Sequence, residues 1–203
     1  SNGRYFFFFF VDETKDQSYV LYSLTQKQLA RTLFPLGHLR KSQVRIIAES
    51  NEFTNAHKHD SQDICFVPNG NYAQFIEQYT GINFKPGDFI NRRGDLLGKH
   101  NGIIRYTVGQ RRGLGIAFKN PMYVCEILRD SNQIVLGEEE ELFSKCLVAT
   151  HINLISVDKI DSPLKLKAKI RYRHEEQSAT VEQIGEDSLH IEFEIPQRAI
   201  TKG

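Results

Sequence analysis

Five side chains that can bind metals or transfer protons lie close together near the end of the first third of the chain. His57, His59, Asp60, Asp63 and Cys65 all occur within the run HKHDSQDIC. Zinc accepts such donors, but a structural zinc site normally shows two pairs of cysteine or histidine at short spacing, and this sequence has no second pair. Cys65 alone allows three further interpretations: the nucleophile of a cysteine hydrolase, a redox or sulfur-carrying thiol, and a small buried apolar side chain. A hydrolase needs an activating histidine, and the other histidines of the chain have no recognisable catalytic context.

Arginines form two further groups with chemical potential. Arg111 and Arg112 stand among glycines in GQRRGLG, which permits a close approach of the backbone to phosphate. The run lacks the GK[ST] ending of a phosphate-binding P-loop. In IRYRH, a predicted strand places Arg171 and Arg173 on one face about 7 Å apart, a spacing that suits successive backbone phosphates. The alternative is a solvated strand face whose arginines pair with glutamates, but together the two groups indicate RNA or DNA binding.

Composition limits where such binding can occur. The 203 residues include 26 Lys and Arg against 25 Asp and Glu, for a formal net charge of +1, so nucleic-acid contacts must come from local clusters.

The three cysteines are far apart and unlike a disulfide framework, which predicts a reducing, intracellular compartment. Cys125 and Cys146 fall in predicted strands, where we expect them to be buried. The run FFFFF is too short to cross a membrane, so we expect no membrane partner.

The elements that must position these side chains change in type along the chain. Residues 14–60 read as helical, with a T-x-x-Q capping box that begins at Thr25 and a second helix that has Val44, Ile47 and Ala48 at helical spacing. Another helix is predicted from Asn71 to a stop at Gly81. Short strands and turns follow, including a hairpin across residues 130–132, and residues 138–142 form either a linker or one helical turn. The final segment alternates apolar and polar residues as antiparallel strands do, so the predicted fold class is α+β.

A short polar run precedes the first of these helices. Lys15, Asp16 and Gln17 lie beside the predicted helix N-terminus, where backbone amides are exposed. Helix capping and solvation explain these three residues equally well.

Five strings, taken in order, resemble the tRNA-specific 2-thiouridylases, which replace the 2-oxygen of the wobble uridine with sulfur. They are KDQSYVLYSL, LFPLGHLRKSQVRIIAE, DSQDICF, GDLLGKHNGIIRYTVGQRRGLGI and KIRYR, and the resemblance covers nearly the whole chain from about Asp12. It implies the helical end of an α/β nucleotide-binding catalytic domain over residues 1–68. A small irregular central tRNA-binding domain over residues 69–142 and a C-terminal antiparallel β-barrel over residues 143–203 would follow.

The resemblance also implies roles for individual residues. Cys65 would accept sulfur as a persulfide, which then attacks a uridine whose 2-oxygen ATP, with Mg²⁺, has adenylated. A second cysteine would release the sulfur by forming a disulfide with Cys65. The implied tRNA contacts are Lys15, Asp16 and Gln17 near the target base and Arg171 with Tyr172 on the backbone. We add Arg173 as a helper of that pair, and Arg111 and Arg112 as hypothetical phosphate contacts, since the resemblance implies that their loop lies against RNA. The expected partners are tRNA and a sulfur-relay protein or cysteine desulfurase, in a cytoplasmic monomer without a bound metal in this chain.

The sequence departs from the family pattern at its start and its end. The SGGxDS loop that binds ATP and the NPDxxC segment that supplies the second cysteine are absent, and the sequence stops at ITKG, where the family usually continues. We therefore expect a C-terminal portion that neither binds ATP productively nor completes thiolation alone. A non-catalytic RNA-binding module with an inert Cys65 is the alternative from a different class, and a cysteine hydrolase is a third.

Overall fold

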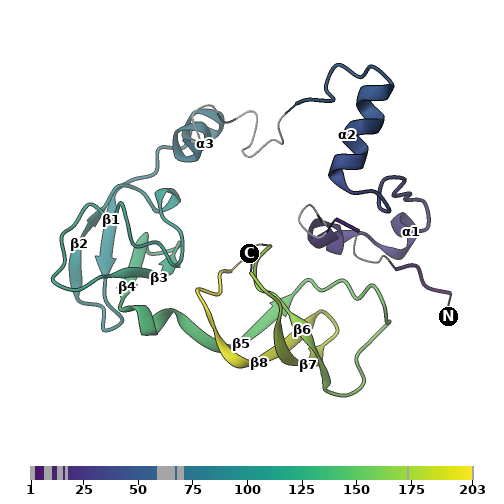
Figure 1. Cartoon of the computed structure of the whole chain (residues 1–203). Coiled ribbons are helices and arrows are strands. Elements are labelled where there is room, and N and C mark those ends of the chain that lie inside the picture. Colours follow the sequence, from purple (N-terminus) through teal and green to yellow (C-terminus); the bar gives the residue numbers. More distant parts are fainter. Residues whose placement is uncertain are drawn as a thin grey trace. The chain divides into compact units, whose positions relative to one another are not determined.

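The computed structural model describes residues 3–6, 11–12, 16, 18–58, 67, 71–172 and 174–202. The chain forms two compact units (Figure 1). Unit 1 contains Ser1–Asp60, Val148–Leu164 and Val181–His190, and unit 2 contains Ser61–Leu147, Lys165–Thr180 and Ile191–Gly203. Each unit thus combines segments that are far apart in the sequence.

The helices of unit 1 are short. The 3-10 helix η1 spans Ser18–Ser23, α1 spans Gln26–Leu29 and α2 spans Lys41–Ser50. The capping box is confirmed, because the Thr25 side chain accepts from the backbone N–H of Gln28 and the Gln28 side chain accepts from that of Thr25. Asn153 joins this region to a distant segment of the same unit, since its Nδ2 donates to the carbonyl of Tyr22 at 2.6 Å.

Unit 2 begins with the predicted helix, which is confirmed as α3, Tyr72–Thr80. The side chain of Asn71 caps its N-terminus, and Gly81 ends it in the left-handed conformation with φ 69°. Arg105, at the end of the 3-10 helix η3 (Ile103–Arg105), donates to the two carboxylate oxygens of Glu77 at 3.0 and 3.1 Å. This ion pair attaches α3 to the rest of the unit.

The first sheet has the strand order β2-β1-β4-β3. Its strands are β1 (Gly87–Ile90), β2 (Leu96–His100), β3 (Tyr123–Leu128) and β4 (Gln133–Gly137). The predicted hairpin is confirmed as the antiparallel pair β3 and β4, whereas β1 and β4 run parallel. One face of the sheet carries the core, whose buried members are Phe89, Tyr106, Leu114, Val124, Ile134 and Leu136.

A histidine is completely buried in this core. His100 packs edge to face against Phe89 and Tyr106, with ring centroids 5.5 and 5.7 Å away. Its Nδ1 accepts from the backbone N–H of Gly102 at 3.1 Å, so Nε2 carries the proton and donates to the carbonyl of Asn132 at 3.1 Å. Burial lowers the pKa of His100, which keeps the ring neutral, although the hydrogen bond to Asn132 opposes the shift.

The second sheet has the order β5-β8-β7-β6 and is open in the described residues. Its strands are β5 (Phe143–Thr150), β6 (Leu164–Ala168), β7 (Gln177–Gly185) and β8 (Ser188–Arg198). Of the two alternatives for residues 138–142, a linker or one helical turn, the structure has the turn, as the 3-10 helix η4 (Glu139–Leu142). The α+β class is confirmed, with a helical start, a small central sheet and an all-β end.

The prediction of a strand through IRYRH is wrong. Strand β6 ends at Ala168, and the chain then bends and turns, with the backbone N–H of His174 donating to the carbonyl of Arg171 at 3.1 Å. A local turn hydrogen bond therefore replaces the extended ladder that period-two alternation predicted. As a result, Arg171 does not lie in a strand, and Arg173 lies outside the described residues.

Candidate nucleic-acid interface

The glycine-rich loop Gly109–Gly115 is firmly attached to the first sheet. The backbone N–H of Gly109 donates to the carbonyl of Val124 at 2.8 Å, and the N–H of Val124 donates back to the carbonyl of Gln110 at 2.9 Å. The Gln110 side chain donates across the loop to the carbonyl of Arg112 at 2.9 Å. Leu114 then returns the chain to the buried core. The loop is thus held at both ends and across its middle.

Two predicted site residues stand at the exposed tip of this loop. Arg111 and Arg112 are both exposed, and in the described part of the chain neither guanidinium has an acidic partner. Cationic side chains presented without an internal carboxylate can contact phosphate without first breaking an ion pair. The loop therefore offers two cations on an anchored backbone.

Arg171 lies at the base of the same loop. Its Nη2 donates to the carbonyl of Ala199 at 2.5 Å, to the hydroxyl of Thr201 and, at 3.5 Å, to the carbonyl of Val108. Val108 directly precedes the glycine-rich loop, so two basic segments that are 60 residues apart in the sequence meet here. Its partners are carbonyls and a hydroxyl rather than the glutamates of the alternative interpretation. Among the described residues, Nε and Nη1 have no hydrogen-bond partner, so the internal bonds use only the Nη2 group.

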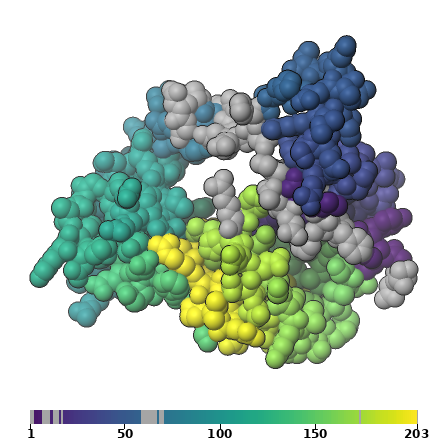
Figure 2. Space-filling view, in the orientation of Figure 1, coloured from purple at the N-terminus to yellow at the C-terminus, as the bar shows by residue number. Residues whose placement is uncertain are grey.

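The segment that receives Arg171 is backbone-strained and buried. Ala199 has φ 56° and only 3% of its surface is exposed, and its N–H donates to the carbonyl of Leu142 at 2.8 Å. A Cβ added at Gly109, which has φ 89°, would lie 3.0 Å from the Cβ of Ala199. Figure 2 shows the yellow C-terminal end of the chain against the green and teal surface of this part of the unit. The close approach therefore explains why glycine occupies position 109.

Tyr172 adds an aromatic ring next to these cations. Its side chain is 43% exposed, and the Nζ of Lys169 lies 6.0 Å from the centroid of its ring. An exposed tyrosine ring can stack a nucleobase. The turn thus contributes a stacking group as well as a charge.

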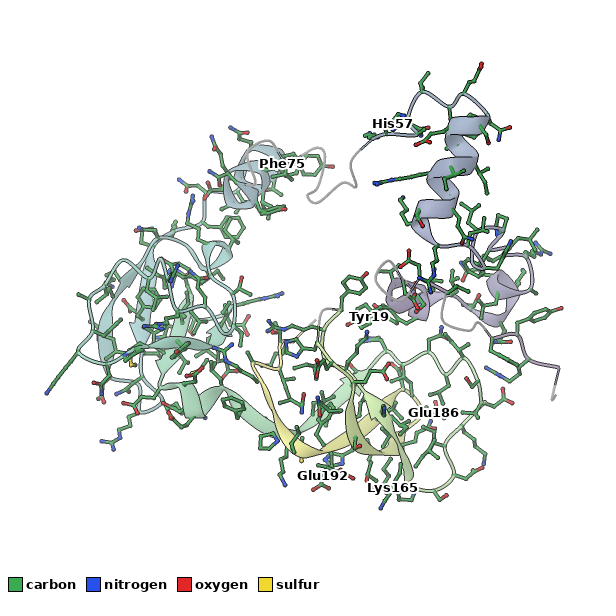
Figure 3. The ribbon with its side chains drawn as sticks, viewed as in Figure 1. Tyr19, His57, Phe75, Lys165, Glu186 and Glu192 are labelled. Atoms are coloured by element: carbon green, nitrogen blue, oxygen red, sulfur yellow. The ribbon has the colours of Figure 1, made fainter. Side chains whose placement is uncertain are left out.

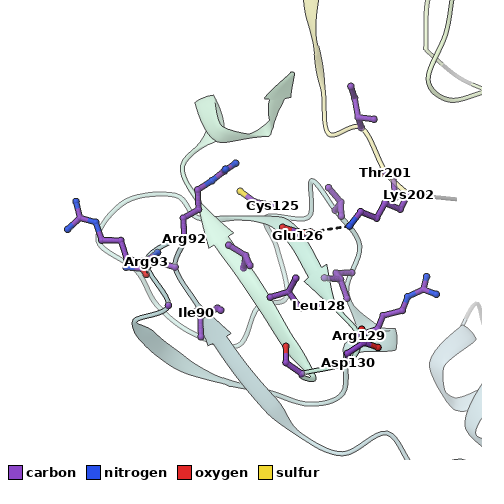
Figure 4. A pocket seen from close by; sticks show the side chains of 17 residues that line it. Ile90, Arg92, Arg93, Cys125, Glu126, Leu128, Arg129, Asp130, Thr201 and Lys202 are labelled. Carbon is purple, nitrogen blue, oxygen red and sulfur yellow. Dashed lines mark hydrogen bonds and ion pairs between the residues drawn. The ribbon is translucent and has the colours of Figure 1, made fainter. Parts of the chain in front are cut away.

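A groove in the same unit contains cations that the sequence analysis missed (Figure 4). It has a volume of about 1260 Å³, and Ile90, Leu128 and Val135 are among its apolar lining residues. Its basic side chains are Arg92, Arg93, Arg129 and Lys202. These cations come from three separate segments, so no local run could reveal the cluster. Part of the charge is neutralised, because Lys202 pairs with Glu126 at 3.2 Å, drawn as a dashed line in Figure 4, and Arg92 pairs with Glu141 at 2.5 Å.

The two described cysteines differ in environment. Cys125 lines the groove and is half-buried, and burial raises the pKa of its thiol, with Glu141 adding to the shift. Cys146 is exposed, so the expectation that it is buried is wrong. The reason lies in β5, where four consecutive residues from Phe143 to Cys146 are exposed and the strand has no buried face at that end.

The remaining predicted residues are only partly described. Asp16 lies before η1, where its Oδ1 accepts from the backbone N–H of Ser18 at 2.6 Å, as a capping side chain does. Cys65, Lys15, Gln17 and Arg173 lie outside the described residues, as do the carboxylates near Cys65. In the residues that are described, no group of three His, Cys, Asp or Glu side chains could hold a metal ion. No helix among them is both long and apolar enough to cross a membrane.

Comparison with known domain families accounts for nearly the whole chain. Residues 3–69 match the tRNA methyl transferase HUP domain, residues 73–138 the tRNA methyl transferase PRC-barrel domain, and residues 144–203 the aminomethyltransferase beta-barrel domain. The order of these domains defines a tRNA-modifying class of protein. The chain belongs to the tRNA-specific 2-thiouridylase family.

Curated relatives give the family its name. The chain is 46% identical over 202 residues to the tRNA-specific 2-thiouridylase MnmA of Lachnoclostridium phytofermentans, covering 100% of this chain and 57% of the relative. It is 46% identical over 203 residues to MnmA of Clostridioides difficile, covering 100% of this chain and 56% of that relative. For MnmA of Acetivibrio thermocellus the identity is 48% over 193 residues, with 95% and 54% covered. The chain therefore spans little more than half the length of these relatives.

Proposed function

We propose that this chain is the tRNA-binding and sulfur-carrying portion of an ATP-dependent tRNA 2-thiouridylase. Support for RNA binding comes from one observation above all: Arg171 donates to the carbonyl of Ala199 at 2.5 Å, and Ala199 lies against Gly109 at the start of the loop that presents Arg111 and Arg112. Two predicted phosphate-contact segments are thereby combined in one place, next to the exposed ring of Tyr172. Arg173, Lys15, Asp16 and Gln17 complete the proposed set of tRNA contacts on the strength of the family resemblance.

Cys65 is the proposed sulfur carrier. The terminal sulfur of its persulfide forms a bond to C2 of the wobble uridine, and the activated 2-oxygen leaves with AMP. A thiolate from a second cysteine then attacks the Cys65 sulfur, which breaks the S–S bond, leaves the transferred sulfur on the uridine and forms a disulfide. A persulfide suits this role because it is more acidic than a thiol and therefore largely anionic near neutral pH.

The residues of this chain do not fit ATP. The sequence has no glycine-rich SGGxDS loop, and we assign no residue here to the nucleotide or to Mg²⁺. In the proposed assignment the nucleotide site belongs to a portion of such enzymes that this sequence does not include. The whole enzyme would act in the cytoplasm as a monomer, with sulfur supplied by a relay protein or a cysteine desulfurase.

RNA binding is tested with labelled tRNA across a series of salt concentrations. We compare the wild-type chain with Arg111→Gln/Arg112→Gln and with a control that loses the same charge elsewhere, Lys85→Gln/Lys145→Gln. Each lost phosphate contact should reduce the slope of log affinity against log salt by about 0.7–0.9, so the arginine variant should lose about 1.4–1.8. Equal slopes in the two variants would contradict the assigned interface.

Sulfur carriage is tested by mass spectrometry after incubation with a cysteine desulfurase and cysteine. One additional sulfur atom should appear on Cys65 and disappear in Cys65→Ser, whereas Cys146→Ser should leave it unchanged. A Cys65 that stays free of additional sulfur under these conditions would favour the non-catalytic RNA-binding module, in which Cys65 is inert.

A further inference from the structure

Strand β6 carries a row of lysines that the proposed tRNA contacts do not include. Lys165 and Lys167 occupy alternate positions of the strand, so their side chains project from the same face of the sheet. Their spacing along the strand is about 6.6 Å. Lys169 follows directly after the last strand residue. A flexible cation at each of these positions matches the repeating charge of a nucleic-acid backbone.

Two lysines of this row have no internal ion pair, unlike several other lysines of the chain. Lys165 and Lys167 are exposed, and within the described ranges no carboxylate lies within ion-pair distance of either (Figure 3 labels Lys165). By contrast, Lys99, Lys159 and Lys202 each have an acidic partner at 2.5, 2.6 and 3.2 Å. Phosphate binding at β6 would therefore not have to compete with an internal ion pair.

The row also continues into the proposed interface. Lys169 lies over the ring of Tyr172, and Arg171 beside it is bonded to the base of the glycine-rich loop. All of these residues belong to unit 2. The two strand lysines, Tyr172 and the arginines of the loop therefore all belong to one compact unit.

We propose that Lys165 and Lys167 bind successive phosphates of an RNA strand that runs along β6 and reaches the loop arginines past Tyr172. This inference rests on the proposed RNA binding and adds a surface and a direction to it. Lysines on an edge strand have a second use, because they prevent pairing with the edge of another sheet, and β6 is an edge strand. The two roles predict different measurements.

The test compares Lys165→Gln/Lys167→Gln with the control Lys85→Gln/Lys145→Gln in tRNA binding across about 50–200 mM salt. Over that range the affinity of the wild type should change about 7- to 12-fold more than that of the β6 variant, which corresponds to two lost phosphate contacts. Lys165→Arg/Lys167→Arg keeps both charges and should keep the wild-type slope. Circular dichroism verifies that each variant is folded.

Two results would overturn the proposal, and they are distinguishable. In the first, the β6 variant keeps the wild-type salt slope while the Arg111→Gln/Arg112→Gln variant has a slope reduced by about 1.4–1.8. The lysines then do not contact RNA, although the proposed function stands. Increased light scattering by that β6 variant would then assign the lysines to edge protection. If the wild-type chain shows no salt-dependent tRNA binding, the row fails together with the RNA-binding function on which it rests.

Discussion

Substitution of Arg171 by alanine should destabilise unit 2 even when no RNA is present. The substitution removes the donor to the carbonyl of Ala199 at 2.5 Å, the donor to the hydroxyl of Thr201 and the long contact to Val108 at 3.5 Å. These bonds join segments that are 28 to 63 residues apart, so the chain has no local substitute for them. The effect on stability is therefore separable from any effect on RNA affinity.

The expected magnitude follows from the individual contacts. A hydrogen bond from a charged donor contributes about 1.5–3 kcal/mol, and the 3.5 Å contact contributes little at that length. The carbonyl of Ala199 keeps one donor in the variant, because the hydroxyl of Thr201 lies 3.1 Å from it. Since Arg171 is only half-buried, we expect the lower part of this range for the site as a whole, a loss of about 2 kcal/mol.

Urea unfolding followed by circular dichroism measures this loss. Arg112→Ala is the matched control, because Arg112 is exposed and its guanidinium has no carboxylate partner among the described residues. The free energy of unfolding of this variant should differ from that of the wild type by less than about 0.5 kcal/mol. Arg171→Lys keeps the charge but presents a single ammonium group instead of a planar fork, so it should recover less than half of the loss. If Arg171→Ala and Arg112→Ala unfold at the same urea concentration, Arg171 does not brace the loop.

Three further perturbations test other parts of unit 2. Burial lowers the pKa of His100, so the unfolded chain binds more protons than the folded chain does near that pKa. The free energy of unfolding should therefore decrease as the pH falls below about 6.5, the ordinary pKa of histidine. Urea unfolding at several pH values should show this dependence, and His100→Gln should lack it. Gly109→Ala should lower the free energy of unfolding, measured in urea, by about 1 kcal/mol more than Gly113→Ala does. Both glycines have positive φ, but only a Cβ at position 109 would meet another atom at 3.0 Å. Equal losses of stability in the two variants would argue against this close approach. Iodoacetamide should label exposed Cys146 faster than Cys125, whose pKa is raised by burial and a neighbouring carboxylate, and equal rates would contradict these environments.

Local signals in the sequence predicted local structure well. The capping box at Thr25 and the stop at Gly81 depend on side chains and backbone conformations within one helical turn, so the sequence contains all the information that they need. The hairpin between β3 and β4 is similarly local, since the four-residue turn 129–132 joins two apolar runs. These predictions are confirmed for that reason.

Tertiary contacts decided the features that the sequence did not predict. Period-two alternation could not reveal that the chain turns after Ala168, because the turn places Arg171 against Val108 and Ala199, which are distant in sequence. The exposure of Cys146 depends on which end of β5 is covered, and that also is not a local property. The groove cations escaped notice because three segments supply them.

The internal bonds of Arg171 change how a loss of RNA affinity at this position should be interpreted. One edge of its guanidinium holds the buried, left-handed Ala199, which lies against Gly109 at the base of the glycine-rich loop, while the proposed phosphate contact uses the other edge. An alanine substitution removes both edges together, so a weakened complex could result from a lost phosphate contact or from a displaced loop. The salt slope separates these causes, because a single direct contact accounts for no more than about 0.9 in slope. A larger loss would require that the arginines of the loop had also lost their phosphates, which places the function of Arg171 in holding the loop as well as in touching RNA.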